Sequence, residues 1–196
     1  MEIKVLHILF WWFTFYQTGW SNPNLLFNER KKIAVINHKN TFENTDSTSE
    51  VFKGFNRFRH FLGMNASKTI VQAEQITPFL LYPFKHDGET FAGYTVRKKG
   101  ALLTQNEIIS LKKIICSDRN YAFDNLMKNC TFTPILGLEF KKGTQIVQVL
   151  ICLDCDVWRF VGHNLNKEED FDIAHERMIN YLRQIFPMDA VVKQIH

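Results

Sequence analysis

The sequence lacks the short motifs that mark the commonest enzyme classes. It contains no G-x-S-x-G nucleophile elbow, no H-E-x-x-H zinc motif, no Walker phosphate loop and no dinucleotide-binding fingerprint. His60, His86 and His163 stand apart in the sequence, and His175-Glu176-Arg177 lacks the second histidine of a zinc motif. These absences favour a non-catalytic protein, and they leave no catalytic, cofactor-binding or metal-binding residue to assign and no cofactor to predict.

The chain also lacks a concentrated run of positive charge. Its net charge is only +4, and no arginine-rich stretch with interleaved aromatic residues marks a nucleic-acid surface. The lysines that occur in pairs are spread along the chain at Lys31-Lys32, Lys98-Lys99, Lys112-Lys113 and Lys141-Lys142. We therefore expect no nucleic-acid partner.

No apolar run is long enough to cross a bilayer comfortably, which takes roughly 20 residues. The run over residues 5–16 follows Lys4, and Gly19 and Ser21 provide the small residues of a cleavage site after Ser21. We therefore predict a signal peptide over 1–21, a polar arm or linker over 22–50 and a single α+β domain over 51–196, in a secreted or periplasmic protein. A buried N-terminal strand or helix is the alternative interpretation of the first segment.

The chain has only four cysteines, Cys116, Cys130, Cys152 and Cys155. An even number favours disulfides in an oxidising compartment, whereas in the cytosol the same residues favour free thiols or a metal site. Cys152 and Cys155 have the C-x-x-C spacing of redox and metal motifs. Nothing in the sequence predicts the helix that follows such a motif in redox proteins.

The segments TFTPILGLEF and QIVQVLICLDC predict an antiparallel hairpin around Lys141-Lys142-Gly143-Thr144. Placing Phe140 opposite Gln145 gives the pairs Leu138–Val147, Leu136–Val149, Pro134–Ile151, Phe132–Leu153 and Cys130–Cys155. This register buries an almost purely apolar face, with Cys152 on the other face. We predict that Cys130 and Cys155 form a cross-strand disulfide or pack as two thiols, and the register alone leaves both open.

The opposite face of the same strand carries Cys152, Asp154 and Asp156, with His163 further along the chain. A thiolate, two carboxylates and an imidazole are ligands for a divalent metal. A metal- or thiol-dependent enzyme is therefore one alternative function. The simpler interpretation is that the aspartates face solvent and Cys152 fills space.

A helix is predicted over 51–62, after a capping box formed by Ser47 and Glu50. Its apolar stripe is Val51, Phe55, Phe58 and Leu62, it carries Lys53, Arg57 and Arg59 on the other side, and it ends at Gly63. Packing on a sheet is the first interpretation of this stripe. A membrane surface or a protein partner, contacted through Phe52, Phe55 and Phe58, is the second alternative function. The 18 phenylalanines of the chain, several outside the expected strands, are its most unusual compositional feature.

Two further helices and one further hairpin complete the prediction. Asp87-Gly88 predicts a tight turn between TIVQAEQITPFLLYPF and TFAGYTVRK. Thr104 and Glu107 cap a helix with an inner face of Ile108, Leu111 and Ile115, and a last helix runs from about 172 to 186, ended by Pro187, with Ile173, Tyr181, Leu182 and Ile185 facing inward. The expected fold class is α+β, with two β-hairpins forming a mostly antiparallel sheet and helices packed on one face.

The pattern Cys130-x-Phe132-x-Pro134, then Val149-Leu150-x-Cys152-x-x-Cys155 and Arg183-x-x-Phe186-Pro187-x-Asp189, resembles a group of uncharacterised bacterial proteins that are often exported. The resemblance extends over residues 66–190 and implies no activity. The leading functional hypothesis is therefore an extracytoplasmic globular protein that acts as a non-catalytic binding or structural module.

Overall fold

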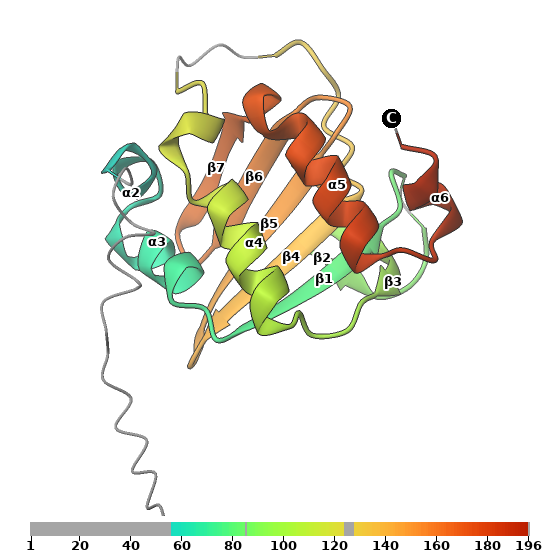
Figure 1. The fold of residues 1–196 in the computed structure, drawn as a ribbon, viewed down its shortest axis with the longest axis horizontal. Helices are drawn as coiled ribbons and strands as arrows, with labels where there is room; N and C mark the ends of the chain where they lie inside the picture. The colour runs from blue at the N-terminus through green and yellow to red at the C-terminus, as the bar shows by residue number, and fades with distance from the viewer. Residues whose placement is uncertain (1–55, 85, 124–127, 196) are drawn as a thin grey trace, which may run out of the picture. The chain divides into compact units, whose positions relative to one another are not determined.

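A seven-stranded antiparallel sheet with the strand order β2-β3-β1-β4-β5-β6-β7 forms the centre of the computed structural model (Figure 1). The structure describes residues 56–84, 86–123 and 128–195. The predicted signal peptide, the arm, Ser47, Glu50, Val51, Phe52 and Phe55 therefore lie outside the described residues. The strands are β1 (Gln75–Leu81), β2 (Thr90–Phe91), β3 (Tyr94–Lys99), β4 (Leu136–Lys142), β5 (Gln145–Cys152), β6 (Val157–Gly162) and β7 (Leu165–Asp170).

Helices α4 and α5 cross one face of this sheet, as Figure 1 shows, while α3 lies against β4 and β5 and α2 packs beside α3. The α-helices are α2 (Asn56–Leu62), α3 (Met64–Val71), α4 (Gln105–Ile115), α5 (His175–Ile185) and α6 (Ala190–Lys193), and the 3-10 turns are η1 (Asp118–Asn120) and η2 (Asp172–Ala174). An α+β fold with an antiparallel sheet and helices on one face is thus confirmed. The prediction of only two hairpins is wrong, because the sheet has seven strands.

The first predicted hairpin has the expected partners, since β1 pairs antiparallel with β3, but its turn is different. The tight turn is Ala92-Gly93, with φ angles of 48° and 87°, and it joins the short strand β2 to β3. Two consecutive positive φ angles are what a two-residue type I′ turn requires. Asp87-Gly88 lies in a loop instead, where the hydroxyl of Thr95 accepts from His86 N and donates to His86 O. The long strand β1 pairs with β3.

The second predicted hairpin exists, but its register differs by two residues. Lys142 pairs with Gln145, and Leu136 pairs with Ile151, so the loop contains only Gly143 and Thr144. Gly143 has a φ of +56°. This two-residue loop needs a positive φ, which glycine adopts without steric cost. A shift of two residues leaves every side chain on its predicted face, and Leu136, Leu138, Phe140, Val147, Val149 and Ile151 are all buried.

Two strands that were not predicted extend the sheet beyond β5. In β6, Trp158 and Phe160 alternate into the core and are fully buried. In β7, by contrast, four consecutive charged residues, 167–170, leave no apolar alternation to recognise. The strand forms because its backbone pairs with β6 along its whole length.

The helices follow their local signals with two exceptions. Gly63 ends α2 with a φ of +82° and donates its N–H to Arg59 O, as predicted. The capping box of Thr104 and Glu107 opens α4, whose inner face is buried as predicted. The residues 69–71, expected in a strand, instead end α3. Ile173, expected to face inward, is 65% exposed because the regular helix begins only at His175.

Each face of the sheet has its own hydrophobic core. The larger core lies under the helices, and a smaller one on the other face contains Phe79, Leu81, Phe91 and Leu150. Phe91 belongs to the edge strand β2, yet its ring lies against Gly137 in β4, where the Cβ of any larger residue would approach within 2.5 Å of Phe91 Cε1. The sheet is therefore strongly curled, because two strands separate β2 from β4 in its order.

Candidate functional site

Cys130 and Cys155 form a disulfide, with Cα atoms 5.9 Å apart. The predicted pairing is confirmed, although the two cysteines do not lie on paired strands. Cys130 precedes β4 and Cys155 lies in the turn between β5 and β6, so the bond joins a loop to a turn. The remaining cysteines, Cys116 and Cys152, are buried free thiols.

The structure does not bring the proposed metal ligands together. Cys152 ends β5 with 0% exposure, and its Sγ lies 3.9 Å from the hydroxyl of Thr133. A turn over 153–156 breaks the strand on which the predicted spacing depends, leaving Asp154 exposed and pairing Asp156 with His175. His163 is exposed in the β6–β7 turn. Within the described parts of the chain, no group of three or more His, Cys, Asp or Glu residues is placed to hold a metal ion.

A cluster of charged side chains lies beside the disulfide. Lys128 Nζ donates to the carbonyl of Cys155 at 2.9 Å and pairs with Asp170 at 2.8 Å and with Asp172. The hydrogen bond from Lys128 lowers the pKa of Asp172. These contacts fasten the loop at 128–130 to the end of β7 and to η2, which is a structural role.

The second half of this cluster is the pair of Asp156 and His175. Burial raises the pKa of the Asp156 carboxyl, and the hydrogen bond with His175 Nδ1 opposes that rise. Asp156 also has a φ of +54° in the β5–β6 turn. The ring of His175 therefore ties an uncommon turn conformation to the start of α5.

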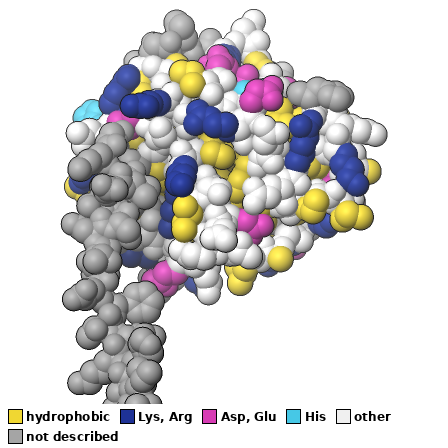
Figure 2. Space-filling model, viewed as in Figure 1, with side chains coloured by type: hydrophobic (Ala, Val, Ile, Leu, Met, Phe, Trp, Pro, Cys, Tyr) yellow, Lys and Arg dark blue, Asp and Glu magenta, His cyan; other side chains and the backbone are white. Residues whose placement is uncertain are grey.

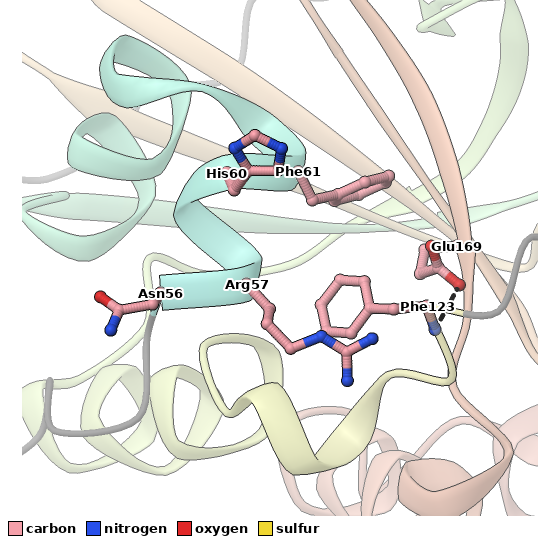
Figure 3. A pocket seen from close by; sticks show the side chains of 6 residues that line it. All are labelled: Asn56, Arg57, His60, Phe61, Phe123 and Glu169. Carbon is pink, nitrogen blue, oxygen red and sulfur yellow. Dashed lines mark hydrogen bonds between the residues drawn. The ribbon is translucent and has the colours of Figure 1, made fainter.

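An open pocket of about 390 Å³ lies between α2, the segment after η1 and β7 (Figure 3). We call it the α2–β7 pocket, and it is lined by Asn56, Arg57, His60, Phe61, Phe123 and Glu169. Its volume is within the range of small-molecule sites, roughly 300–1,000 Å³. Its lining combines two aromatic walls with charged and polar side chains.

The position of Phe123, one wall of the pocket, is fixed by three contacts. Its ring stacks on Tyr121, with centroids 4.9 Å apart, and its backbone N–H donates to Glu169 Oε1 at 3.2 Å, the dashed line in Figure 3. Tyr121 is held in turn by a hydrogen bond from its hydroxyl to Ile115 O. Phe61, the second wall, meets Phe123 edge to face, with centroids 5.9 Å apart. The φ of Phe123 is +50°, an uncommon value for a bulky residue.

The pocket lining includes an exposed arginine, Arg57, whose side chain has no acidic partner among the described residues. The guanidinium of Arg57 lies 4.4 Å from the centroid of the Phe123 ring. Among the residues that the structure describes, no side-chain or backbone oxygen accepts a hydrogen bond from this guanidinium. Its backbone is fixed from outside the helix, because Asp118 accepts from the N–H groups of Arg57 and Phe58 at 3.1 and 2.9 Å. Arg57 is thus positioned with its donors unused.

Two more charged groups stand near the aromatic walls. Glu169 Oε1 accepts from the backbone N–H groups of Phe123 and Asp170, both at 3.2 Å. Lys167 Nζ lies 5.4 Å from the centroid of the Phe61 ring and donates to Phe61 O. One oxygen of the Glu169 carboxylate is therefore already hydrogen-bonded, and the ammonium group of Lys167 is a second positive charge beside the pocket.

The helix proposed as a membrane or partner surface is bound into the core instead, as far as it is described. Phe58 is 0% exposed, and its ring meets those of Tyr121 and Phe160 at 5.6 and 6.1 Å. Phe58 is therefore not available to a membrane or a partner. In the described part of the chain, no helix is both apolar and long enough to span a membrane.

Sequence reasoning did not predict the α2–β7 pocket. Its residues come from a helix, a loop and an edge strand, and they share no spacing that a periodic pattern would reveal. The signal that was present is the excess of phenylalanine outside the expected strands, which includes Phe61 and Phe123.

On the face drawn in Figure 2, the lysine and arginine side chains lie scattered among uncharged ones.

Comparison of the chain with protein-family models, with curated proteins and with solved structures finds no match. The resemblance to exported bacterial proteins stays a prediction. The chemistry of the pocket is accordingly inferred from its own residues.

Proposed function

We propose that this chain is an exported, non-catalytic binding protein that holds a small ligand in the α2–β7 pocket. The observation that carries the proposal is the exposed guanidinium of Arg57, which lies over the Phe123 ring in an open pocket of about 390 Å³ and donates to no residue that the structure describes. A positioned cation between aromatic walls is a ready contact for a ligand, because such pockets combine apolar area with a few fixed polar groups.

Export is supported by the disulfide and by the N-terminal segment. A Cys130–Cys155 bond is compatible with an oxidising compartment outside the cytoplasm. The first 21 residues have the charge, apolar run and small residues of a signal peptide. The resemblance to exported bacterial proteins points the same way.

A binding role rather than a catalytic one is supported by the side chains themselves. Of the side chains that line the pocket, His60 and Glu169 are the ones with nucleophilic or acid–base capacity, and Glu169 Oε1 is already engaged by two backbone N–H groups. The two free thiols are buried elsewhere, and burial raises the pKa of Cys116, which disfavours the reactive thiolate.

The test begins with the full-length chain produced in a Gram-negative bacterial host. We expect protein in the periplasmic fraction whose mass places its first residue at 22, with the peptides of Cys130 and Cys155 linked and two thiols that alkylate only after unfolding. Cytoplasmic protein with four free thiols would contradict export.

The binding role is tested on the same protein, labelled with ¹⁵N, by adding a library of small fragments. We expect some fragments to shift the amide signals of Arg57, Phe61 and Phe123 and to be recovered chemically unchanged. Conversion of a fragment would contradict the non-catalytic assignment. A library that shifts none of the pocket signals would rule out the pocket as a binding site.

A further inference from the structure

We infer that the ligand of the α2–β7 pocket is a small organic carboxylate with a planar hydrocarbon group. This inference rests on the proposed function, and it adds the chemical class of the ligand. The carboxylate binds the guanidinium of Arg57, and the planar group packs against Phe61 and Phe123. Figure 3 shows that these three side chains converge from α2 and from the segment after η1.

The stacked geometry of Arg57 favours a carboxylate. A guanidinium that lies over an aromatic ring, here 4.4 Å from the Phe123 centroid, keeps its N–H donors at the edge of its plane. Those donors form a fork that matches the two oxygens of a carboxylate. Because the described residues offer this guanidinium no acceptor, a ligand carboxylate displaces no existing ion pair.

The two aromatic walls favour a planar hydrocarbon group. Arg57 and Tyr121 already cover the two faces of the Phe123 ring, and Phe61 meets that ring at an interplanar angle of 66°, so Phe123 presents its edge to the pocket. A flat ligand ring beside Arg57 receives this edge in an edge-to-face contact, one of the preferred aromatic arrangements. Since three contacts already fix Phe123, binding orders this wall at little entropic cost.

The charged groups around the pocket favour an anionic ligand over an amine. Arg57 and Lys167 place two positive charges at the aromatic walls. The nearby carboxylates of Glu169 and Asp118 each already accept two backbone N–H groups. An amine would therefore meet both cations and only carboxylates that are already hydrogen-bonded.

The test compares three probes of one shape, namely 3-phenylpropionate, the neutral 3-phenylpropanamide and the cationic 3-phenylpropylamine. Binding to the purified exported protein is measured by ¹⁵N NMR titration at low ionic strength. We expect the carboxylate to bind about tenfold more tightly than the amide, the size of one charge-assisted hydrogen-bonded pair, and the amine to bind most weakly.

Three variants separate charge from shape. Arg57→Gln reduces the affinity for the carboxylate to that for the amide, while the matched control Arg59→Gln, on the same helix but outside the pocket lining, leaves all three affinities unchanged. Phe123→Leu weakens the carboxylate and the amide by the same factor. Amide spectra verify that each variant is folded, and the probe comparison on the unaltered protein stands even if Arg57→Gln does not fold.

The outcomes distinguish this inference from the proposed function. Equal binding of carboxylate and amide, tighter binding of the amine, or an Arg57→Gln variant that keeps the preference would overturn the carboxylate assignment and leave the pocket as a binding site. If none of the three probes shifts the pocket signals while other fragments do, only the ligand class is wrong. If no fragment shifts them, both proposals fall.

Discussion

Arg97 and Asp189, 92 residues apart in the chain, form a two-pronged ion pair that joins β3 to α6. The guanidinium nitrogens Nη1 and Nη2 lie 3.1 and 2.9 Å from the two carboxylate oxygens. Asp189 Oδ1 also accepts from the N–H groups of Val191 and Val192 at the start of α6. One carboxylate thus anchors the C-terminal helix in two ways.

Removing the charge of Asp189 should destabilise the fold by about 1.5–3 kcal/mol, more than an exposed ion pair contributes, because Asp189 is only 7% exposed. Asp189→Asn keeps a side-chain oxygen that can cap α6, whereas Asp189→Ala loses the cap as well, for a further loss of about 1 kcal/mol. Urea unfolding of both variants at pH 7 measures these differences. A variant Asp189→Ala that is no less stable than Asp189→Asn would contradict the capping role.

The same carboxylate predicts a pH dependence of stability. The hydrogen bond from Arg97 lowers the pKa of Asp189 below its ordinary value. Its stabilising contribution is therefore complete above the pKa of the unfolded chain, about 3.9, and is lost as the pH falls through the lower folded value. The difference in unfolding free energy between the unaltered protein and Asp189→Asn should accordingly be constant above pH 5 and shrink below pH 4. A difference in unfolding free energy that stays constant down to pH 2 would contradict a stabilising role of the Asp189 charge.

Loss of the disulfide should reduce the unfolding free energy by about 3 kcal/mol, because the bond closes a loop of 25 residues in the unfolded chain. Cys130→Ala, Cys155→Ala and the double variant should lose similar amounts, since any of them removes the bond. Chemical denaturation with and without dithiothreitol measures the effect. The double variant is the control, and a response of its stability to dithiothreitol would show that the reductant acts elsewhere.

Gly137→Ala should destabilise the protein by about 1–3 kcal/mol, the range for overpacking a core. A Cβ at this position would lie 2.5 Å from Cε1 and 2.6 Å from Cδ1 of Phe91, so the ring must move off β4. Gly162→Ala is the matched strand control, because its Cβ would meet Ile146 O at 3.4 Å and Leu165 at 3.7 Å, which are ordinary contacts. The decrease in unfolding temperature is measured for both variants, and equal decreases would contradict the contact between Gly137 and Phe91.

His175→Gln should raise the pKa of Asp156 further. The hydrogen bond and the charge of His175 both lower this pKa against the effect of burial, so removing the imidazole removes an opposing contribution. A ¹³C NMR titration of the Asp156 carboxyl carbon measures the change. His163→Gln, in the exposed β6–β7 turn, is the control and should leave the titration of Asp156 unchanged.

Sequence reasoning succeeded where the determining contacts are local. The capping box of Thr104 and Glu107 and the terminating Gly63 act within a single turn of chain, so their positions could be read directly. The alternation of Leu136, Leu138 and Phe140 likewise identified a buried strand face. It could not fix the register, because shifts of two residues bury the same side chains.

The failures lie where partners distant in the chain decide the structure. Asp87-Gly88 is a strong turn signal, but Thr95 holds its neighbour His86 in a loop and Ala92-Gly93 makes the tight turn instead. The charged residues of β7 become a strand only by pairing with β6. The pocket was missed for the same reason, since Phe123 and Glu169 meet only in the folded chain.

The two edge strands of the curled sheet affect how copies of this protein associate with one another. One border is β2, which is only two residues long, and the other is β7, where Lys167, Glu168, Glu169 and Asp170 follow in succession. An edge strand that is so short, or so heavily charged, is a poor template for pairing with a strand from a neighbouring molecule. Concentrated solutions of the folded protein should therefore resist fibril growth through strand addition, although a broad β-sheet lies at its centre.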